Sequence, residues 1–565
     1  MSERTLQALR EALLRIDGRG YGAYKRIAGA WRAGPLTLFI DHVQGDPFAQ
    51  PSRLRLRLSP EAHGIPADLW DSPPRRAALT DFVLRRFAEA AARQARRSGS
   101  GHSGSIFVDA GGAEILARSG CAIGPEGLEV RFRVGLPARG RSVLGRAAAQ
   151  LLCEALPAAA RALRWSQLDQ QAAQAFVDLA DDHAHLQALL AERGLVAFMR
   201  DGSVLPRASG VSSAPLPGAV PFESPPSLRV TLPTRHHGEV HGMGLPRGVT
   251  LITGGGFHGK TTLLEALQAG IYPHVPGDGR EWVVTDRAAA KVRSEDGRAV
   301  TGVDISAFVR DLPSGRSPVC FHTEDASGST SLAAGIVEAL EGGARVLLLD
   351  EDTCATNLLV RDARMQALVA RETLVPLLDR VRPLYEEHGV SLLLVAGGLG
   401  DYLDVADHVL LMEDYRCRDA TEQARAVARQ LPTGRQVETD LPPLAPTRRV
   451  PEPASFAPRR RGGRRGKVRA RGLRELSFGE ERLDLDAVEQ LVDDSQVRTL
   501  GVLLERLGAH CNGRRSLAEC VELAVREAEE RGLYALAPLP ELAAVRPLEL
   551  LAAASRLRSL RLARR

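Results

Sequence analysis

The feature that most constrains the fold of this chain is a glycine-rich stretch, Gly254-Gly255-Gly256-Phe257-His258-Gly259-Lys260-Thr261-Thr262. It fits the pattern G-x-x-x-x-G-K-[ST], in which glycines let backbone N–H groups point inward at phosphate oxygens. An apolar strand, residues 249–252, precedes the stretch, and a helical pattern follows from Thr261. The N-terminus of that helix adds its dipole to the anion site. We therefore expect a phosphate-binding loop between a strand and a helix.

Lysine is rare in this chain, which makes Lys260 informative. It occurs only at positions 25, 260, 291 and 467, so arginine supplies nearly all of the 74 basic residues. A compact ammonium fits between β- and γ-phosphates where a planar guanidinium does not. The lysine favours a nucleotide-binding loop over an ordinary glycine-rich turn. For Lys25 and Lys291, a loop that approaches phosphate and a turn packed on the core explain the lysine equally well.

Length and composition bound the class of protein. A chain of 565 residues is expected to form three or four domains. The net charge is only +5, so any nucleic-acid surface must be local. Seven cysteines without a C-x-x-C pair indicate reduced thiols in a cytoplasmic protein. Residues 6–14 follow an amphipathic helical pattern without the apolar core of a signal peptide, so we expect none, and no uncharged apolar run approaches the ~20 residues that cross a bilayer.

We expect four regions along the chain. Residues 1–215 mix alternating strands with helical patterns, which is typical of an α+β domain, and a segment rich in Ser, Pro and Gly follows. Residues 225–435 alternate helices with continuous apolar strands, which predicts an α/β domain with a parallel sheet. Residues 446–474 form a basic linker. Residues 475–565 are predicted to be mainly helical, with helices over 483–507 and 516–531.

A second motif, residues 345–351, is an apolar strand that ends in Asp350 and Glu351. In a Walker B strand the first acid reaches Mg²⁺ and the second polarises the attacking water. Asp350 would then share the metal with the hydroxyl of Thr261, and Glu351 would orient water. Taken alone, a buried strand ending in two exposed acids fits a structural role about equally well.

Ser327 and Gly328 open a helix that leads into the Asp350 strand. Their position resembles the signature-to-Walker-B spacing of ABC-class ATPases, in which this Ser-Gly binds the γ-phosphate held by the other subunit. A helix N-terminus suits that anion. A plain helix N-cap at Ser327 is the alternative. With the loop and the strand present, we favour the signature.

Four features depart from the usual ABC pattern. Residues 354–357 occupy the D-loop position, but Asn357 replaces the usual Asp. Residues 396–398 place glycine where a switch histidine is typical. No convincing Q-loop glutamine precedes Ser327, and no aromatic residue lies between Phe222 and Phe257 to stack on adenine.

Several segments resemble one family, the predicted ATPases of the ABC class, whose kinetoplastid member belongs to a mitochondrial RNA-editing assembly. The matching segments are residues 16–25, 41–49, 134–141, 254–261, 276–281 and 350–357. The resemblance implies an N-terminal domain, an ABC-type core and a C-terminal domain, working as a nucleotide-sandwich dimer. The glycine at the switch position and Asn357 also look like family features, so neither implies an inactive site.

The stretch 446–474 contains ten arginines and Lys467 against one acid, Glu452. It is too charged to bury itself, so we expect a mobile segment. Arg448–Arg474 would pair with RNA or another single-stranded nucleic acid, without sequence preference and with strong salt dependence. A merely solubilising linker is the alternative.

These observations predict a soluble, cytoplasmic ABC-class ATPase that binds and hydrolyses Mg-ATP in a sandwich dimer, coupled to nucleic-acid binding. Residues 254–262 hold the phosphates, Thr261 and Asp350 hold Mg²⁺, and Glu351 orients water. Ser327 and Gly328 close the site from the partner chain. One rival is a nucleotide-gated clamp or scaffold with little turnover. A second, a P-loop kinase, is disfavoured by the spacing of Ser327.

Overall fold

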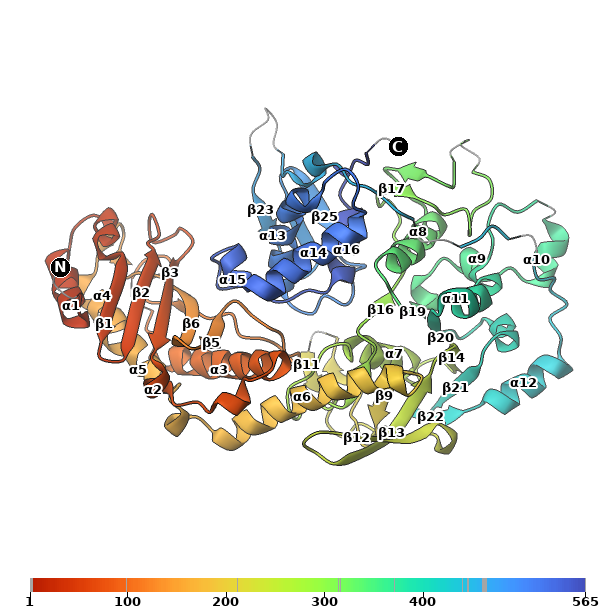
Figure 1. The fold of residues 1–565 in the computed structure, drawn as a ribbon, viewed down its shortest axis with the longest axis horizontal. Coiled ribbons are helices and arrows are strands. Elements are labelled where there is room, and N and C mark those ends of the chain that lie inside the picture. The colour runs from red at the N-terminus through yellow and green to blue at the C-terminus, as the bar shows by residue number, and fades with distance from the viewer. Residues whose placement is uncertain are drawn as a thin grey trace. The chain divides into compact units, whose positions relative to one another are not determined.

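A computed structural model describes residues 4–97, 99–210, 212–312, 315, 317–369, 371–438, 441–444, 447–459 and 465–563. The chain divides into two compact units (Figure 1). The first comprises residues 1–181 and 531–544, and the second residues 182–530 and 545–565. The helix α6 (Gln170–Glu192) carries the chain from one to the other.

The first unit contains an antiparallel sheet in the order β1-β2-β3-β6-β4, with β5 also pairing with β6. Its inner face is apolar because β3 alternates leucine with arginine, and Leu54, Leu56 and Leu58 are the buried set. The strands are β1 (Gly29–Ala33), β2 (Leu36–His42), β3 (Ser52–Leu58), β4 (Ile106–Phe107), β5 (Cys121–Gly124) and β6 (Gly127–Val134), and the helices are α1 (Leu6–Arg15), α2 (Pro60–His63), α3 (Pro73–Gln94), α4 (Gly145–Gln150) and α5 (Leu156–Arg161). A two-stranded ribbon pairs β7 (Ala138–Arg139) with β8 (Ser142–Val143).

The segment 531–544 belongs to this first unit although it comes late in the sequence. It contains the short helix α15 (Leu533–Leu536). The guanidinium of Arg133 on β6 forms an ion pair with Glu541, and Arg131 lies 4.1 Å from the ring centroid of Tyr534. The hydroxyl of Ser119 donates to the carbonyl of Leu539 at 2.7 Å. Charged and polar contacts therefore attach the segment to the outer face of the sheet.

The second unit is built on a parallel sheet in the order β16-β19-β20-β14-β21, with β22 antiparallel at one edge. Its strands are β14 (Val249–Gly254), β16 (Ala289–Lys291), β19 (Val346–Asp350), β20 (Ser391–Val395), β21 (His408–Glu413) and β22 (Arg416–Asp419). Every residue of β19 and β20 is buried, which confirms the parallel sheet predicted from continuous apolar runs. The α/β fold class is thus confirmed.

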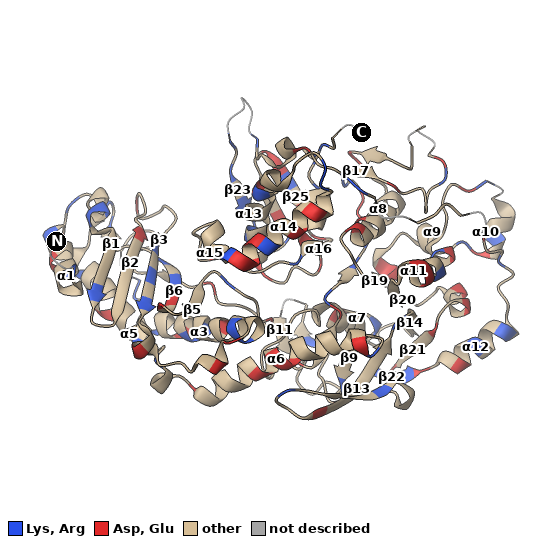
Figure 2. Ribbon diagram, in the orientation of Figure 1, with Lys and Arg blue, Asp and Glu red and all other residues tan. Residues whose placement is uncertain are grey.

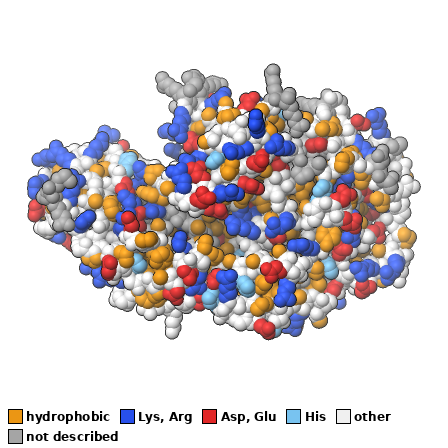
Figure 3. Space-filling view, viewed as in Figure 1, with side chains coloured by type: hydrophobic (Ala, Val, Ile, Leu, Met, Phe, Trp, Pro, Cys, Tyr) orange, Lys and Arg blue, Asp and Glu red, His pale blue; other side chains and the backbone are white. Residues whose placement is uncertain are grey.

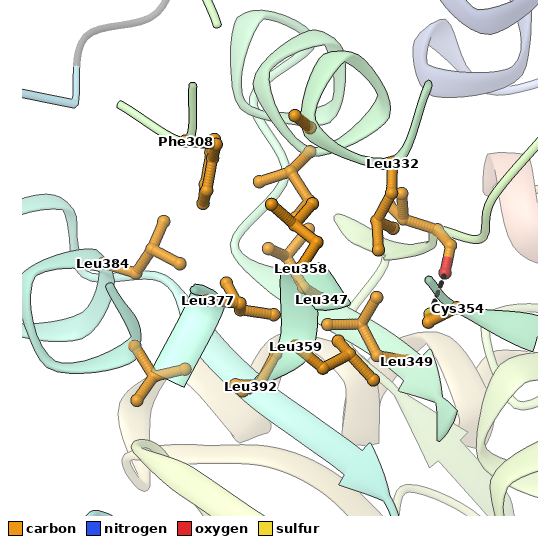
Figure 4. Packing of buried hydrophobic residues seen from close by; sticks show 14 of the residues in the cluster. Phe308, Leu332, Leu347, Leu349, Cys354, Leu358, Leu359, Leu377, Leu384 and Leu392 are labelled. Carbon is orange, nitrogen blue, oxygen red and sulfur yellow. Dashed lines mark hydrogen bonds between the residues drawn. The ribbon is translucent and has the colours of Figure 1, made fainter. Parts of the chain in front are cut away.

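Helices cover this sheet. The helix α7 (Lys260–Ala269) packs against β14, β16, β19 and β20. Leu347, Leu349 and Leu392 belong to a hydrophobic core that includes residues of α8, α9 and α11, as Figure 4 shows. The remaining helices of this domain are α8 (Gly328–Glu341), α9 (Thr356–Leu359), α10 (Ala363–Leu368), α11 (Val381–His388) and α12 (Thr421–Gln430).

Smaller sheets complete the nucleotide-binding part. A four-stranded antiparallel sheet has the order β12-β13-β9-β15. It comprises β9 (Leu195–Arg200), β12 (Arg229–Pro233), β13 (Glu239–Pro246) and β15 (Val283–Thr285). Two ribbons pair β10 (Arg207–Ser209) with β11 (Ser212–Pro215), and β17 (Val300–Val303) with β18 (Phe321–Thr323).

The C-terminal region is mainly helical, as predicted, but begins with a small sheet. That sheet comprises β23 (Val468–Ala470), β24 (Glu475–Phe478) and β25 (Glu481–Asp484). The helices are α13 (Asp494–His510), α14 (Leu517–Arg531) and α16 (Pro547–Ser555). The helix expected over 483–507 therefore starts later, because Leu483 is a buried strand residue and Asp493 caps α13.

The basic stretch 446–474 differs from the expectation of an unburied, mobile segment. In its described residues, Arg449 is among the most deeply buried side chains and forms an ion pair with Glu341 at 2.7 Å. Phe456 is also buried. The charged side chain of Arg449 can be buried because its guanidinium is paired with the carboxylate of Glu341 on α8. Residues 460–464, which hold three of the ten arginines, lie outside the described residues.

Candidate nucleotide-binding site

The glycine-rich loop joins the end of β14 to the start of α7. Gly254 has φ 140° and Gly259 has φ 92°, conformations that residues with a side chain rarely adopt. A Cβ at Gly254 would also collide with the carbonyl oxygen of Met412 on β21. Gly259 caps α7, so Lys260 is the first residue of the helix. The local structure is the strand, loop and helix that the sequence predicts.

The side chain of Lys260 hydrogen-bonds to the backbone of its own loop. Its ammonium donates to the carbonyl oxygens of Gly254 at 2.8 Å and of Gly255 at 2.7 Å. Both acceptors are part of the loop itself, and a phosphate oxygen placed there would offer a charged acceptor instead, which makes a stronger hydrogen bond. The cation is thus available to an anionic ligand.

The two predicted magnesium ligands come together. The hydroxyl of Thr261, in the first turn of α7, lies beside the carboxyl of Asp350 at the end of β19, close enough to lower the pKa of that carboxyl. Burial raises the pKa of Asp350, partly offset by hydrogen bonds from the Asp352 backbone and from Thr261. A hydroxyl and a carboxylate are hard oxygen ligands of the kind Mg²⁺ accepts alongside phosphate oxygens and water. The residues present therefore fit the ion.

No group of three or more His, Cys, Asp or Glu side chains in the described part of the chain is arranged to hold a metal by itself. A magnesium ion held by one hydroxyl, one carboxylate and the phosphates of a nucleotide needs no such group.

Glu351, the predicted water-orienting acid, lies against the glycine loop that follows β20. Its Oε2 accepts hydrogen bonds from the backbone N–H groups of Gly397 at 2.7 Å and Gly398 at 3.1 Å. A Cβ at Gly397 would lie 3.9 Å from Nζ of Lys260. The loop at the position where a switch histidine is typical thus contacts Glu351 through its backbone N–H groups, and it passes near the phosphate-loop lysine.

Ser327 caps the helix α8. Its hydroxyl accepts from the backbone N–H of Thr330 at 3.4 Å, and Gly328 is the first helical residue. A Cβ at Gly328 would stand 3.4 Å from the carboxyl of Asp296 and 3.7 Å from Ala355, the second residue of the D-loop stretch. Asn357, in α9, is exposed. The helix N-terminus that would face a γ-phosphate is therefore formed, and Ser327 plays the capping role as well.

Three family models match successive parts of the chain. The model described as ATPase of the ABC class N-terminal covers residues 6–165, the P-loop domain model of the ABC ATPase covers residues 169–448, and the MRB1590 C-terminal domain model covers residues 467–563. The chain belongs to the ABC-class ATPase family. The resemblance inferred from the sequence is confirmed.

Among curated proteins, this ABC-class ATPase is 30% identical over 244 residues to the uncharacterized protein MJ1628 of Methanocaldococcus jannaschii. The match covers 41% of this chain and 54% of that protein, so the chain spans about half the length of this relative. Similar solved structures include cbiO1 from Clostridium perfringens, described as part of the ABC transporter complex cbiONQ, at 14% identity and TM-score 0.26, covering 42% of this chain and 96% of that one.

Another is MJ1267, an ATP-binding cassette of an ABC transporter in its ADP conformation, at 13% identity and TM-score 0.24, with the same coverage. In the described residues of this ABC-class ATPase, no helix is both long and apolar enough to cross a membrane.

Two contacts at the site were not predicted. The turn between β21 and β22 meets the phosphate loop, because the backbone N–H of Asp414 donates to Nδ1 of His258 at 2.7 Å. The second contact involves Lys291, at the end of β16 beside the Asp350 strand. Its ammonium forms an ion pair with Glu489 at 3.3 Å, and its charge offsets part of the rise that burial causes in the pKa of Asp350. The scarcity of lysine was the only sequence signal for it.

The other lysine singled out in the sequence, Lys25, is exposed in a short helical turn, Tyr21–Ile27. Two tyrosines hold this turn on the first unit: Tyr21 donates to the carbonyl of Leu136 at 3.1 Å and Tyr24 to that of Pro137 at 2.6 Å. These contacts support the interpretation as a turn packed on the core.

Proposed function

We propose that this protein binds and hydrolyses Mg-ATP between two copies of the chain and couples that cycle to RNA or another nucleic acid. The observation that carries the proposal is the convergence of Lys260, the Thr261–Asp350 pair and Glu351 in one site of an ABC-class ATPase. The phosphate loop and Lys260 would hold the phosphates. Thr261 and Asp350 would hold Mg²⁺, which supplies charge neutralisation on the phosphate oxygens when bound.

Glu351 would orient the attacking water and accept its proton. Two backbone N–H groups hold its carboxylate in place, so little reorganisation is needed before the water is engaged. Ser327 and Gly328, at the N-terminus of α8, would contact the γ-phosphate bound by the partner copy, where a helix N-terminus favours negative charge.

Replacing Glu351 with Gln tests the assignment. The glutamine carbonyl can still accept from Gly397 and Gly398, so the loop is kept while the base is lost. We expect phosphate release to fall by at least two orders of magnitude and gel filtration with Mg-ATP to show a trapped dimer. Asp352→Asn removes an exposed acid one residue away and serves as the control, with turnover and elution like wild type. Hydrolysis by Glu351→Gln at the wild-type rate would show that Glu351 is not the base.

A nucleotide-gated clamp with little turnover is the second candidate. It is favoured by Gly397 and Gly398, which offer no side chain to a γ-phosphate and whose backbone N–H groups donate to Glu351. Phosphate release measured with and without RNA separates the two. A clamp would dimerise with ATP yet release no phosphate in either condition.

The nucleic-acid part of the proposal rests on the described residues of Arg448–Arg474. Arg449 is buried and unable to contact a ligand, whereas Lys467, Arg469 and Arg471 are exposed at alternate positions along β23 and its continuation (Figure 2). On the face shown in Figure 3, basic and acidic side chains are interspersed. A nucleic-acid site on this protein is therefore expected to be a short local stripe of basic residues, such as Lys467, Arg469 and Arg471.

Replacing Lys467, Arg469 and Arg471 together with Gln tests this surface without removing the buried Arg449. If all three contact phosphates of a single strand, the slope of log K against log salt should become shallower by about 2. Binding should fall for all sequences alike. An unchanged slope would remove this stripe from the proposal while leaving the ATPase assignment untouched.

A further inference from the structure

Three non-glycine residues with positive φ gather at one place in the described part of the chain. They are Phe257 at 63°, Asp414 at 48° and Tyr415 at 64°. The first lies in the phosphate loop, and the other two form the turn between β21 and β22. A bulky residue in this conformation is a backbone outlier, and such outliers cluster at ligand sites. The presence of three such residues in and beside the phosphate loop therefore suggests a functional role.

The two loops touch. β14 and β21 are paired, with Gly254 opposite Met412, so the turn after β21 leaves the sheet beside the loop after β14. The Asp414 N–H donates to His258 at 2.7 Å. A Cβ added to Gly259 would lie 3.4 Å from Cδ1 of Tyr415, so the tyrosine ring lies in van der Waals range of the last loop residue before Lys260.

Apart from its contact with Gly259, Tyr415 gains little burial to offset the strain of its backbone. The residue is 61% exposed, and a two-residue hairpin turn with positive φ favours Asn-Gly or Asp-Gly. Here Asp414 fits the first position, but tyrosine occupies the position where glycine is preferred. Phe257, in the adjoining loop, is 98% exposed. Two aromatic surfaces thus face solvent at the border of the phosphate cradle.

We propose that Tyr415 is the stacking platform for the base of the bound nucleotide, with Phe257 offering a second aromatic surface. Aromatic rings stack on any nucleobase, and no aromatic residue lies between Phe222 and Phe257 to do so. Gly259 directly precedes Lys260, Thr261 and Thr262, so the ring stands next to the phosphate-binding residues. This inference rests on the proposed nucleotide site. It adds a binding residue for the base, whereas the sequence motifs account only for the phosphates and Mg²⁺.

The test compares ATP with inorganic tripolyphosphate, which shares the phosphates but has no base. Tyr415→Gly suits the turn, because glycine adopts positive φ freely, and thermal unfolding should show no loss of stability. We expect ATP affinity to fall about 5- to 100-fold, with tripolyphosphate affinity unchanged. Tyr415→Phe keeps the ring and serves as the matched control, with both affinities like wild type. Calorimetry or competition with a fluorescent nucleotide gives the values.

Each outcome separates the hypotheses. Unchanged ATP affinity in Tyr415→Gly would overturn the platform, and so would an equal loss for ATP and tripolyphosphate, because the ring would then act only through the phosphate loop. Failure of the wild-type protein to bind either compound would instead overturn the nucleotide site itself, and the platform with it.

Discussion

At Gly398 the absence of a side chain has a direct geometric consequence. A Cβ there would lie 3.3 Å from Oε1 of Glu351, which is tighter than an ordinary contact, whereas a Cβ at Gly397 would meet Lys260 only at 3.9 Å. We expect Gly398→Ala to displace the Glu351 carboxylate and lower kcat about tenfold, because catalysis depends on the position of the base. Affinity for ATP should stay within twofold.

Gly397→Ala is the matched control for that prediction. It adds the same methyl group one residue away and should lower kcat much less. Steady-state phosphate release and equilibrium ATP binding measure the two effects. Equal losses in kcat for both variants would show that the loop responds to any added side chain and that contact with Glu351 is not the cause.

Arg449 shows how a charged residue can serve as a core residue. Its side chain is fully buried, pairs with Glu341 at 2.7 Å and donates to the hydroxyl of Ser555 at 2.8 Å. Burial raises the pKa of Glu341, and the arginine partly offsets that rise. Arg449→Met would leave a buried carboxyl group without its cation, and we expect a loss of about 3–5 kcal/mol in the free energy of unfolding.

Chemical denaturation measures that loss. Arg448→Met, one residue earlier, removes an exposed arginine whose pair with Glu519 spans 3.3 Å, and should cost less than about 1 kcal/mol. If both variants lost the same small amount, the buried ion pair would not be holding residues 447–459 on the second unit.

Among the elements, long apolar strands could be predicted and short ones could not. β14, β19, β20 and β21 follow from continuous runs of Val, Leu and Ile, but β16 has only three residues and β22 is the polar sequence Arg-Cys-Arg-Asp. Such strands form because a neighbouring strand offers hydrogen-bond partners, which is information outside the segment itself. The later start of α13 is visible in retrospect, since Asp493 and Gln496 form a capping box.

The same distinction applies to the site. Lys260, Thr261, Asp350 and Glu351 could be chosen from the sequence because their chemistry is set by neighbours in linear motifs. The contact of Asp414 with His258 joins residues 156 positions apart, and that of Glu351 with Gly397 joins residues 46 apart. No local pattern encodes such contacts, because they depend on the order of strands in the sheet.

The helix α6 carries a pH-dependent contact. Nε2 of His183 lies 3.1 Å from the carbonyl oxygen of Gly270, and burial lowers the pKa of His183 from 6.5 to about 4. Between these two values the unfolded chain binds a proton that the folded protein does not. Stability is therefore present above pH 6.5 and falls as the pH decreases toward 4, by about 3 kcal/mol from this group.

His183→Gln should flatten that dependence, because the glutamine amide can donate to Gly270 and does not titrate. Thermal unfolding between pH 7 and pH 4.5 measures the change. His185→Gln, two residues along the same helix, is the control and should keep the wild-type pH profile. A His183→Gln variant with an unaltered profile would assign the acid sensitivity to other groups.

In the whole molecule, residues that are close in the sequence can belong to different compact units. Glu541 belongs to the unit that contains the N-terminal sheet, where it pairs with the buried Arg133. We expect Glu541→Ala to destabilise that sheet by about 2–4 kcal/mol, since it leaves a buried guanidinium unpaired. Hydrogen exchange should accelerate in β3 and β6 and stay unchanged in β14 and β19.

Glu529→Ala is the control, because Glu529 is exposed and its pair with Arg287 spans 3.6 Å. It should leave exchange in β3 and β6 as in wild type. Faster exchange throughout both units in Glu541→Ala would mean that the two units unfold together and that the effect of the mutation is global.

The return of residues 531–544 to the first unit also affects how the protein is made. A ribosome adds about 5–20 residues per second, so the segment emerges on the order of tens of seconds after residue 181. During that interval the face of the N-terminal sheet that carries Arg131 and Arg133 lacks its contacts with residues 531–544. Synthesis thus sets a delay before this unit can complete its fold.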